Sequence, residues 1–478
     1  MKIALILCYF ATWAFIPHLL LLKKRPSATL AWLWAIIFIP FLGALVYLAI
    51  GTDRLKRRRL RRRSLYSTRV SRQAHQAGTT DEGTTALLRQ IAPRDRQFLQ
   101  LLSRVNHLPS SSAASLRILR DSADFYEALA RRIAGARHHI HLEFYIWNPD
   151  ETGTRFLILL TEAARRGVVV RLLLDGVGSH GFNEGALKDL RAAGGQFSWF
   201  QSLDPKRNRF FLNLRNHRKI AVFDHARAIV GGRNLAREYM GRDSFPKRWR
   251  DLGAAIDGPA AALLNEVFIA DWCFATRQPP ETLHAEFSDQ AVEPCGEGEL
   301  QVVASGPDVP GDPLYEGIVA MIQEAERSIW IVTPYFIPDD VLLRSLIVKA
   351  RAGRSVTLVV PARSNHRIAD FARRQYLREL RKAGARLLLY TPGMLHAKAI
   401  IIDDQLALFG SPNFDVRSLF VNFEVGVLAH SKPEVAAITA WAEALMKECV
   451  EFKADPNPKR KIFGNVAEDI SRLLAPLL

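Results

Sequence analysis

The chain lacks the cysteine spacing that builds disulfide frameworks or zinc sites. It has four cysteines in 478 residues, and no two of them form a C-x-x-C pair. A reducing compartment is the simplest interpretation. The composition also lacks the bias of a disordered or collagen-like chain, because 49% of the residues are hydrophobic and 24% are charged. The length predicts two or three domains.

Acidic residues are in deficit. There are 48 Asp and Glu against 65 Lys and Arg, which gives a formal net charge of +17. This excess favours a partner rich in phosphate, either nucleic acid or an anionic membrane. The first fifty residues favour the membrane.

Formal charge is absent from two long apolar runs, residues 3–22 and 27–52. Each run is long enough to cross the roughly 30 Å of a bilayer's hydrocarbon core as a helix. Because only Lys23 to Pro26 separate them, residues 1–52 are predicted to form a two-helix membrane hairpin. A secretory signal peptide is the alternative for the first run, but the second run follows it at once.

A strongly basic segment follows the second run. Eight Lys or Arg lie between Arg54 and Arg63, against the single Asp53. The positive-inside rule places this segment and the rest of the chain in the cytoplasm. Lys23, Lys24 and Arg25 disagree, so a hairpin that only dips into the membrane stays open. The segment is either a solvated stop signal or a collector of anionic lipid headgroups.

The remainder divides into a linker and an alternating body. Residues 53–112 are interpreted as a basic juxtamembrane segment and linker, because Gly, Pro and polar residues interrupt them. The body then alternates apolar runs with helical stretches, which predicts an α/β fold. Expected strands are His139–Trp147, Val168–Leu174, Ile220–Phe223, Ile329–Phe336, Val356–Val360 and Ala399–Ile402, and expected helices include Ala123–Ala134 and Pro338–Ala352.

The body repeats itself. The segment from His217 through Lys219 and Asp224 to Asn234 recurs 179 residues later, as His396, Lys398, Asp403 and Asn413. A repeat of this length predicts two related lobes, 113–290 and 291–478.

Strand geometry groups the repeated residues. His and Lys two positions apart point to one face of a strand, whereas Asp224 and Asp403 have the opposite parity and are expected to be supporting. A two-residue turn after each strand would place His217 opposite Asn234, and His396 opposite Asn413. A bulge would shift this pairing.

These side chains suit phosphodiester chemistry. Lys and Asn donate to phosphoryl oxygens, and an imidazole can attack phosphorus or protonate a leaving oxygen. Two copies supply both a nucleophile and a general acid, and no metal or cofactor is expected, because two Lys and two Asn neutralise the phosphate. Each histidine also needs an acceptor for its other nitrogen. The candidates are Asp251, 34 residues after His217, and Glu424, 28 residues after His396.

The doubled H-x-K-x4-D pattern resembles that of the phospholipase D superfamily. Nearly the whole chain resembles the membrane-anchored bacterial cardiolipin synthases within it, through both motifs, the HLEFYIW and TPYFIP strands, RWRDLGAAIDGPA and GSPNFDVRSLFVNFE. The resemblance implies two tandem lobes facing each other after the hairpin. The first motif departs slightly: Gly232 cannot supply the hydroxyl that Ser411 does, but glycine still lets the backbone approach a phosphate.

The resemblance further implies a phosphatidyl transfer in which two phosphatidylglycerol molecules give cardiolipin and glycerol through a phosphatidyl-histidine. By analogy His217 is the nucleophile and His396 the acid and base, although the swap stays open. Expected partners are phosphatidylglycerol and anionic membrane lipids, without nucleic acid, and the expected location is the bacterial inner membrane, multi-pass, with cytoplasmic lobes. A hydrolase, a transfer to another alcohol, a nuclease and a non-catalytic lipid scaffold remain alternatives.

Two further segments have two interpretations each. Arg209–Leu214 is either a lipid-access lip or a buried strand, and residues 470–478 form either an interfacial helix or a helix packed on the second lobe.

Overall fold

The computed structural model describes residues 13, 15–21, 26–47, 102, 105–106, 108–202, 214–287, 292–309 and 311–453. The basic segment, the linker up to residue 101, residues 209–213 of the expected lip and the C-terminal stretch 470–478 lie outside these residues. The predictions for them therefore stay predictions.

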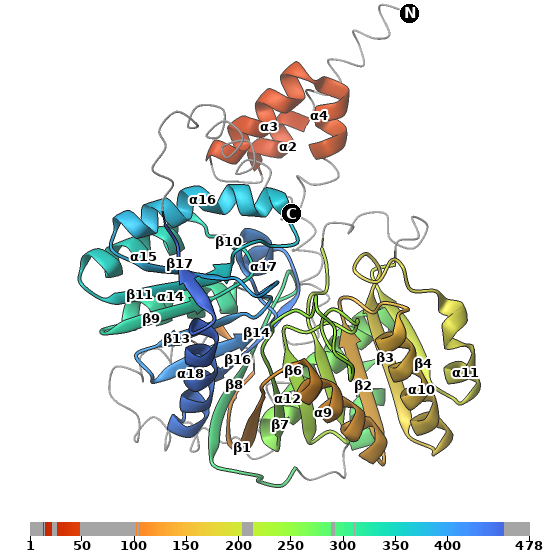
Figure 1. Ribbon diagram of the computed structural model, residues 1–478. Coiled ribbons are helices and arrows are strands. Elements are labelled where there is room, and N and C mark those ends of the chain that lie inside the picture. Colours follow the sequence, from red (N-terminus) through yellow and green to blue (C-terminus); the bar gives the residue numbers. More distant parts are fainter. Residues whose placement is uncertain are drawn as a thin grey trace, which may run out of the picture.

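Fifteen strands form one continuous sheet through both halves of the body (Figure 1). The first lobe contributes seven of them, in the order β1-β7-β6-β5-β2-β3-β4 from the centre outward. Their bounds are β1 Ser110–Leu119, β2 His139–Phe144, β3 Val169–Asp175, β4 Gln196–Phe200, β5 Ile220–Phe223, β6 Arg227–Gly231 and β7 Gly253–Asp257.

The second lobe repeats this order outward as β8-β16-β14-β13-β9-β11-β12 and adds β17 at the edge. Its strands are β8 Gly298–Ser305, β9 Ser328–Val332, β11 Ser355–Pro361, β12 Arg386–Tyr390, β13 Ala399–Ile402, β14 Leu406–Gly410, β16 Glu424–Ala429 and β17 Cys449–Glu451. A small second sheet pairs β10 Phe336–Ile337 with β15 Phe414–Asp415. The lobes join where β1 and β8 pair antiparallel. The predicted pair of tandem α/β lobes is thus confirmed.

Helices cover both faces of the sheet. On one face α12 (Pro259–Thr276) and α18 (Lys432–Met446) bury a hydrophobic core that both lobes share. The other face has a separate core in each lobe. The remaining helices in the described part of the body are α9 Ser122–Gly135, α10 Glu151–Arg165, η3 Glu184–Leu187, α11 Lys188–Ala192, α13 Pro280–His284, η4 Ala285–Phe287, α14 Pro313–Glu324, α15 Asp340–Arg351, α16 Arg367–Lys382 and α17 Val416–Phe420.

The expected strands and helices are confirmed to within a few residues, with one split and one boundary shift. The run expected as a single strand over Ile329–Phe336 is divided between β9 and β10. β1 begins at Ser110, inside the predicted linker, because Ser110 and Ser111 pair with β8 at the centre of the sheet.

The predicted hairpin register is wrong by one residue in both lobes. Phe223 pairs with Arg227, and Ile402 pairs with Leu406, so each turn has three residues instead of two. The physical reason is a pair of left-handed residues in each turn, Asp224 and His225 in the first lobe, with φ of 48° and 62°. The second lobe repeats this with Asp403 and Asp404. His217 and Lys219 also precede β5 itself.

The described residues of the N-terminal region form three short helices, α2 (Phe15–Leu21), α3 (Pro26–Phe38) and α4 (Pro40–Val46). The second apolar run is therefore not one continuous helix. The break falls at Ile39, where φ is −130° and ψ is 63°, directly before Pro40. Among the described residues, no helix is both long and apolar enough to cross a membrane.

Candidate active site

The segments that lead into β5 and β13 cross over to the opposite lobe. Asn216 forms a bridge with Phe423, and the His217 N–H donates to the Phe423 carbonyl at 2.9 Å. In the mirror arrangement Arg250 forms a bridge with Leu395, and the His396 N–H donates to the Arg250 carbonyl at 2.7 Å. Each histidine is therefore fixed beside the residue that precedes a carboxylate of the other lobe.

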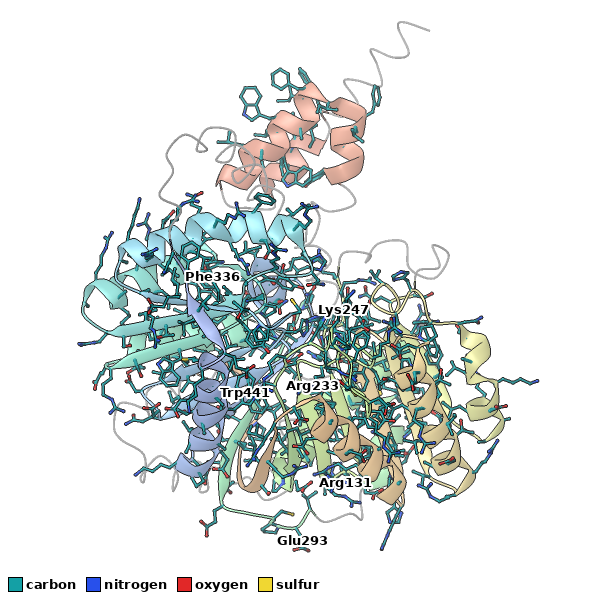
Figure 2. All side chains as sticks on the ribbon, viewed as in Figure 1. Arg131, Arg233, Lys247, Glu293, Phe336 and Trp441 are labelled. Carbon is teal, nitrogen blue, oxygen red and sulfur yellow. The ribbon has the colours of Figure 1, made fainter. Side chains whose placement is uncertain are left out.

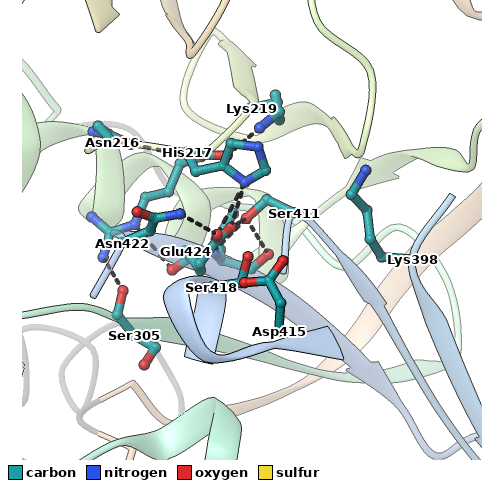
Figure 3. A network of polar contacts seen from close by, with 12 residues as sticks. Asn216, His217, Lys219, Ser305, Lys398, Ser411, Asp415, Ser418, Asn422 and Glu424 are labelled. Carbon is teal, nitrogen blue, oxygen red and sulfur yellow. Dashed lines mark hydrogen bonds and ion pairs between the residues drawn. The ribbon is translucent and has the colours of Figure 1, made fainter. Parts of the chain in front are cut away.

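This crossing pairs each imidazole with a carboxylate. Nδ1 of His217 lies 3.0 Å from both carboxylate oxygens of Glu424 (Figure 3). Nδ1 of His396 lies 2.7 Å from Oδ2 of Asp251. The sequence offers both carboxylates as candidate acceptors, each located by its distance along the chain from the histidine of its own lobe. The structure exchanges them, so both dyads span the boundary between the lobes.

Burial governs the charge of these dyads. It lowers the pKa of His217 to about 4, although Glu424 opposes the shift. Burial and Lys398 together lower the pKa of His396 to about 3, against the effect of Asp251. Burial acts to raise the pKa of Asp251. The charges of Lys398 and His396 outweigh this effect and hold that pKa at about 2. Without a ligand, both imidazoles are neutral at pH 7.

The lysine of each motif lies against its own histidine. Each Nζ donates to the backbone carbonyl of its own histidine, and Nζ of Lys398 lies 3.1 Å from Nε2 of His396. Burial lowers the pKa of Lys398 to about 8 and lowers that of Lys219 well below its usual value. A bound phosphate would oppose this burial effect and favour the charged lysines.

Asp224 and Asp403 brace the scaffold. The carboxylate of Asp224 accepts the N–H groups of Arg137, His138 and His139 at the start of β2. Asp403 accepts the N–H groups of Glu326, Arg327 and Ser328 in the same way at β9. These contacts fit the supporting role that strand parity predicts.

The residues after β6 and β14 differ between the lobes. The Ser411 hydroxyl donates to Oε2 of Glu424 at 2.5 Å. At the equivalent Gly232 an added Cβ would lie only 2.3 Å from Oδ1 of Asp251, so the missing side chain makes room for that carboxylate. Arg233 follows Gly232 and is fully buried toward the middle of the molecule (Figure 2). Its positive charge helps to lower the pKa of Asp251.

Both histidines line one pocket, together with Asn234 and Asn413. Oδ1 of Asn234 accepts the Ile146 N–H at 3.1 Å. The hairpin prediction was wrong in register, yet the structure does bring these four side chains together. The same pocket is lined by Tyr145, Tyr239, Tyr335, Arg215 and Arg417.

The sequence reasoning missed these aromatic and basic side chains. The ring of Tyr145 lies 5.0 Å from that of His217, and the ring of Tyr239 lies 5.2 Å from that of His396. One available signal was position: Tyr145 directly follows a fully buried strand, at the sheet edge where sites of open α/β folds form.

Arg218, also missed, ties the lobes together beneath His217. Its Nε donates to the Glu424 carbonyl and its Nη2 to the Ser305 carbonyl, both at 3.1 Å, while Nη1 pairs with Asp271 at 2.5 Å. The second motif has Ala397 at this position. Among the residues described, no group of three or more His, Cys, Asp or Glu is placed to hold a metal ion.

Comparisons with known proteins identify a family and several relatives that the chain resembles. The family described as "Cardiolipin synthase, PLD-like domain" matches residues 129–272 and 318–446, and "Phospholipase_D-nuclease N-terminal" matches residues 10–51. A cardiolipin synthase of Geobacillus sp. (strain WCH70) is 34% identical over 464 residues, covering 95% of this chain and 90% of the relative. Cardiolipin synthase 2 of Bacillus anthracis is 34% identical over 459 residues, covering 95% and 88%.

A solved structure shares the fold. The phosphatidylserine synthase of Haemophilus influenzae Rd KW20 aligns with a TM-score of 0.61 at 15% identity, covering 80% of this chain and 100% of that one.

Proposed function

The chain belongs to the family of cardiolipin synthases with phospholipase D-like domains, and we propose that it converts two phosphatidylglycerol molecules into cardiolipin and glycerol. One observation carries this proposal: two histidines, each held by a carboxylate of the opposite lobe, line a single pocket. A nucleophile and a general acid at one phosphorus are what transfer through a covalent intermediate requires.

In the first step, Nε2 of His217 attacks the phosphorus of the donor lipid. Because Nδ1 of His217 faces Glu424, its proton stays on that nitrogen and the Nε2 lone pair is available. The new N–P bond forms while the bond from phosphorus to the headgroup glycerol oxygen breaks. His396, protonated in the substrate complex, gives its Nε2 proton to that oxygen, and glycerol departs.

In the second step, a terminal hydroxyl of another phosphatidylglycerol gives its proton to neutral His396. Its oxygen bonds to phosphorus, the N–P bond breaks, and His217 returns to its neutral form. Glu424 and Asp251 stabilise the cationic imidazoles that form in turn. His396 needs a higher pKa than about 3 to begin the cycle, and the negative charge of the bound phosphate raises it.

Lys219, Lys398, Asn234 and Asn413 are proposed to bind the non-bridging phosphoryl oxygens. Two lysines and two side-chain amides stabilise the charge that develops on phosphorus. Within this proposal the enzyme works at the bacterial inner membrane, with its two lobes on the cytoplasmic side and its N-terminal region in the membrane. The apolar side chains exposed on α2 to α4, such as Leu20, Trp34 and Phe38, support that placement.

The test is mass spectrometry of lipids after the full chain is incubated with phosphatidylglycerol in EDTA. We expect cardiolipin and glycerol in equal amounts, and loss of both products in His217→Ala and His396→Ala. Phosphatidic acid as the sole lipid product would identify a hydrolase instead. Unchanged product in either variant would contradict the assigned roles.

A further inference from the structure

Helix α16 carries a basic and apolar stripe, in which positions 367, 374 and 381 are exposed and positions 371 and 378 are half-buried. Positions 367, 371, 374, 378 and 381 recur at helical spacing along one face, and they are four arginines and one phenylalanine without an acidic residue. The Arg374 guanidinium lies 4.6 Å from the centre of the Phe371 ring. Ile368, next to this stripe, is 41% exposed.

The acidic residues of α16 are engaged beside the helix itself. Asp370 pairs with the buried Arg373 at 3.0 Å and accepts the Ser364 N–H. Glu379 accepts a hydrogen bond from Gln375 at 3.1 Å. The outward face of α16 therefore combines positive charge with exposed apolar surface.

The equivalent connection in the first lobe has neither property. There η3 and α11 link β3 to β4, as α16 links β11 to β12. Their charged residues balance, with Glu184 and Asp189 against Lys188 and Arg191, and Arg191 pairs with Glu184 at 2.6 Å. The basic stripe is thus a property of this helix and not of the repeated fold.

Helix α16 also begins at the pocket. His366, its N-cap, and Ala369, in its first turn, line the same pocket as His217 and His396. The buried face of the helix packs on β10, through Ala369 and Ala372 against Ile337. In Figure 1, α16 lies on the side of the body that faces α2, α3 and α4, whose surfaces are apolar.

We propose that the outer face of α16 rests on an anionic lipid bilayer and presents the pocket mouth to the headgroups. The exposed arginines of the stripe supply the positive charge that attracts acidic headgroups. Ile368 and Phe371 supply the apolar side chains that enter the boundary between headgroups and acyl chains. A substrate then reaches the two histidines while its acyl chains stay in the bilayer.

The inference rests on the proposed function for its activity test, which compares two physical forms of one substrate. The full chain with Ile368→Asp is assayed on phosphatidylglycerol in vesicles and in nonionic detergent micelles. We expect about a tenfold lower rate on vesicles and a micelle rate within about twofold of the parent chain. Ile158→Asp is the matched control, because Ile158 is 45% exposed on α10, whose outward charges are mixed, and its rates should not change. Equal losses on both forms, or no loss on vesicles, would overturn the inference.

A second readout does not need catalysis. A polarity-sensitive fluorophore is placed at Ile368→Cys, or at Ile158→Cys as the control, after the four native cysteines are replaced. We expect a blue shift at position 368 in phosphatidylglycerol vesicles and a smaller one in phosphatidylcholine vesicles, with none at 158. Absence of a shift at 368, or a shift produced by duplex DNA or by protein concentration without vesicles, would overturn the inference. A parent chain that makes no cardiolipin yet shows this shift would instead refute the proposed function.

Discussion

The two lobes share their strand order but differ in the residues that hold the histidines. In the second lobe Ser411 donates a hydrogen bond to Glu424, the partner of His217. In the first lobe Gly232 leaves room for Asp251, the partner of His396, and Arg233 acts on that carboxylate by its charge. One carboxylate is held by a neutral hydroxyl and the other sits near a buried cation. Both lobes therefore pair a histidine with a carboxylate in the same way, while the electrostatic surroundings of the two pairs differ.

This comparison predicts first that the carboxylates act across lobes. Asp251→Asn and Glu424→Gln should each lower kcat by about 10²- to 10⁴-fold, because the imidazole loses the anion that fixes its tautomer and stabilises its cation. The measurement is steady-state transfer in a double-mutant cycle. Coupling is expected for His217 with Glu424 and for His396 with Asp251. Stronger coupling within one lobe would contradict the crossed arrangement.

The second difference is Arg218 in the first motif against Ala397 in the second. Arg218→Met should cost about 3–5 kcal/mol of stability, because it leaves the buried Asp271 without its cation. The midpoint of thermal unfolding measures this loss. Asp271→Asn in the same chain should restore part of it. Arg131→Met on the exposed face of α9 is the control. An equal loss of stability in that variant would contradict the assignment of the Arg218→Met effect to the unpaired Asp271.

The third prediction exchanges the residues that distinguish the motifs. Gly232→Ser places a Cβ within 2.3 Å of Oδ1 of Asp251, so we expect displacement of that carboxylate and about a 10- to 100-fold lower kcat. Ser411→Gly removes one hydrogen bond to Glu424 and should cost about 3- to 10-fold. The transfer rates of the two variants test whether Gly232→Ser causes the larger loss of activity. A harmless Gly232→Ser would show that the lobes are interchangeable here.

The smallest predicted effect is on the pH dependence of kcat/KM, whose fall at high pH distinguishes the two lysines. Burial lowers the pKa of Lys398 to about 8, and the phosphate needs this lysine in its charged form. The value of kcat/KM should therefore fall as pH rises through about 8. Lys398→Arg should move this limb upward, because arginine stays protonated. If Lys219→Arg moves the limb instead, the lysine of the first lobe controls it.

Much of the fold was predictable because local patterns determine it. The alternation of apolar runs and amphipathic stretches located β5 and β13 to the residue, and the 179-residue repeat identified the two lobes. The hairpin register was not predictable to one residue, since it depends on left-handed backbone at Asp224 and Asp403. The hydropathy of residues 27–52 does not reveal the break at Ile39, because that break depends on the backbone constraint of Pro40.

The sequence by itself determined the chemical groups of the site. The repeated spacing of His, Lys and Asn predicts that these side chains meet once in each lobe. The sequence also offers Asp251 and Glu424 as candidate acceptors. Only the tertiary structure decided which acceptor serves which histidine, because the bridges from Asn216 to Phe423 and from Arg250 to Leu395 connect residues of different lobes. Spacing along the chain describes neighbours within a lobe. Partners across a pseudo-symmetric boundary depend on how the lobes pack, which no local pattern encodes.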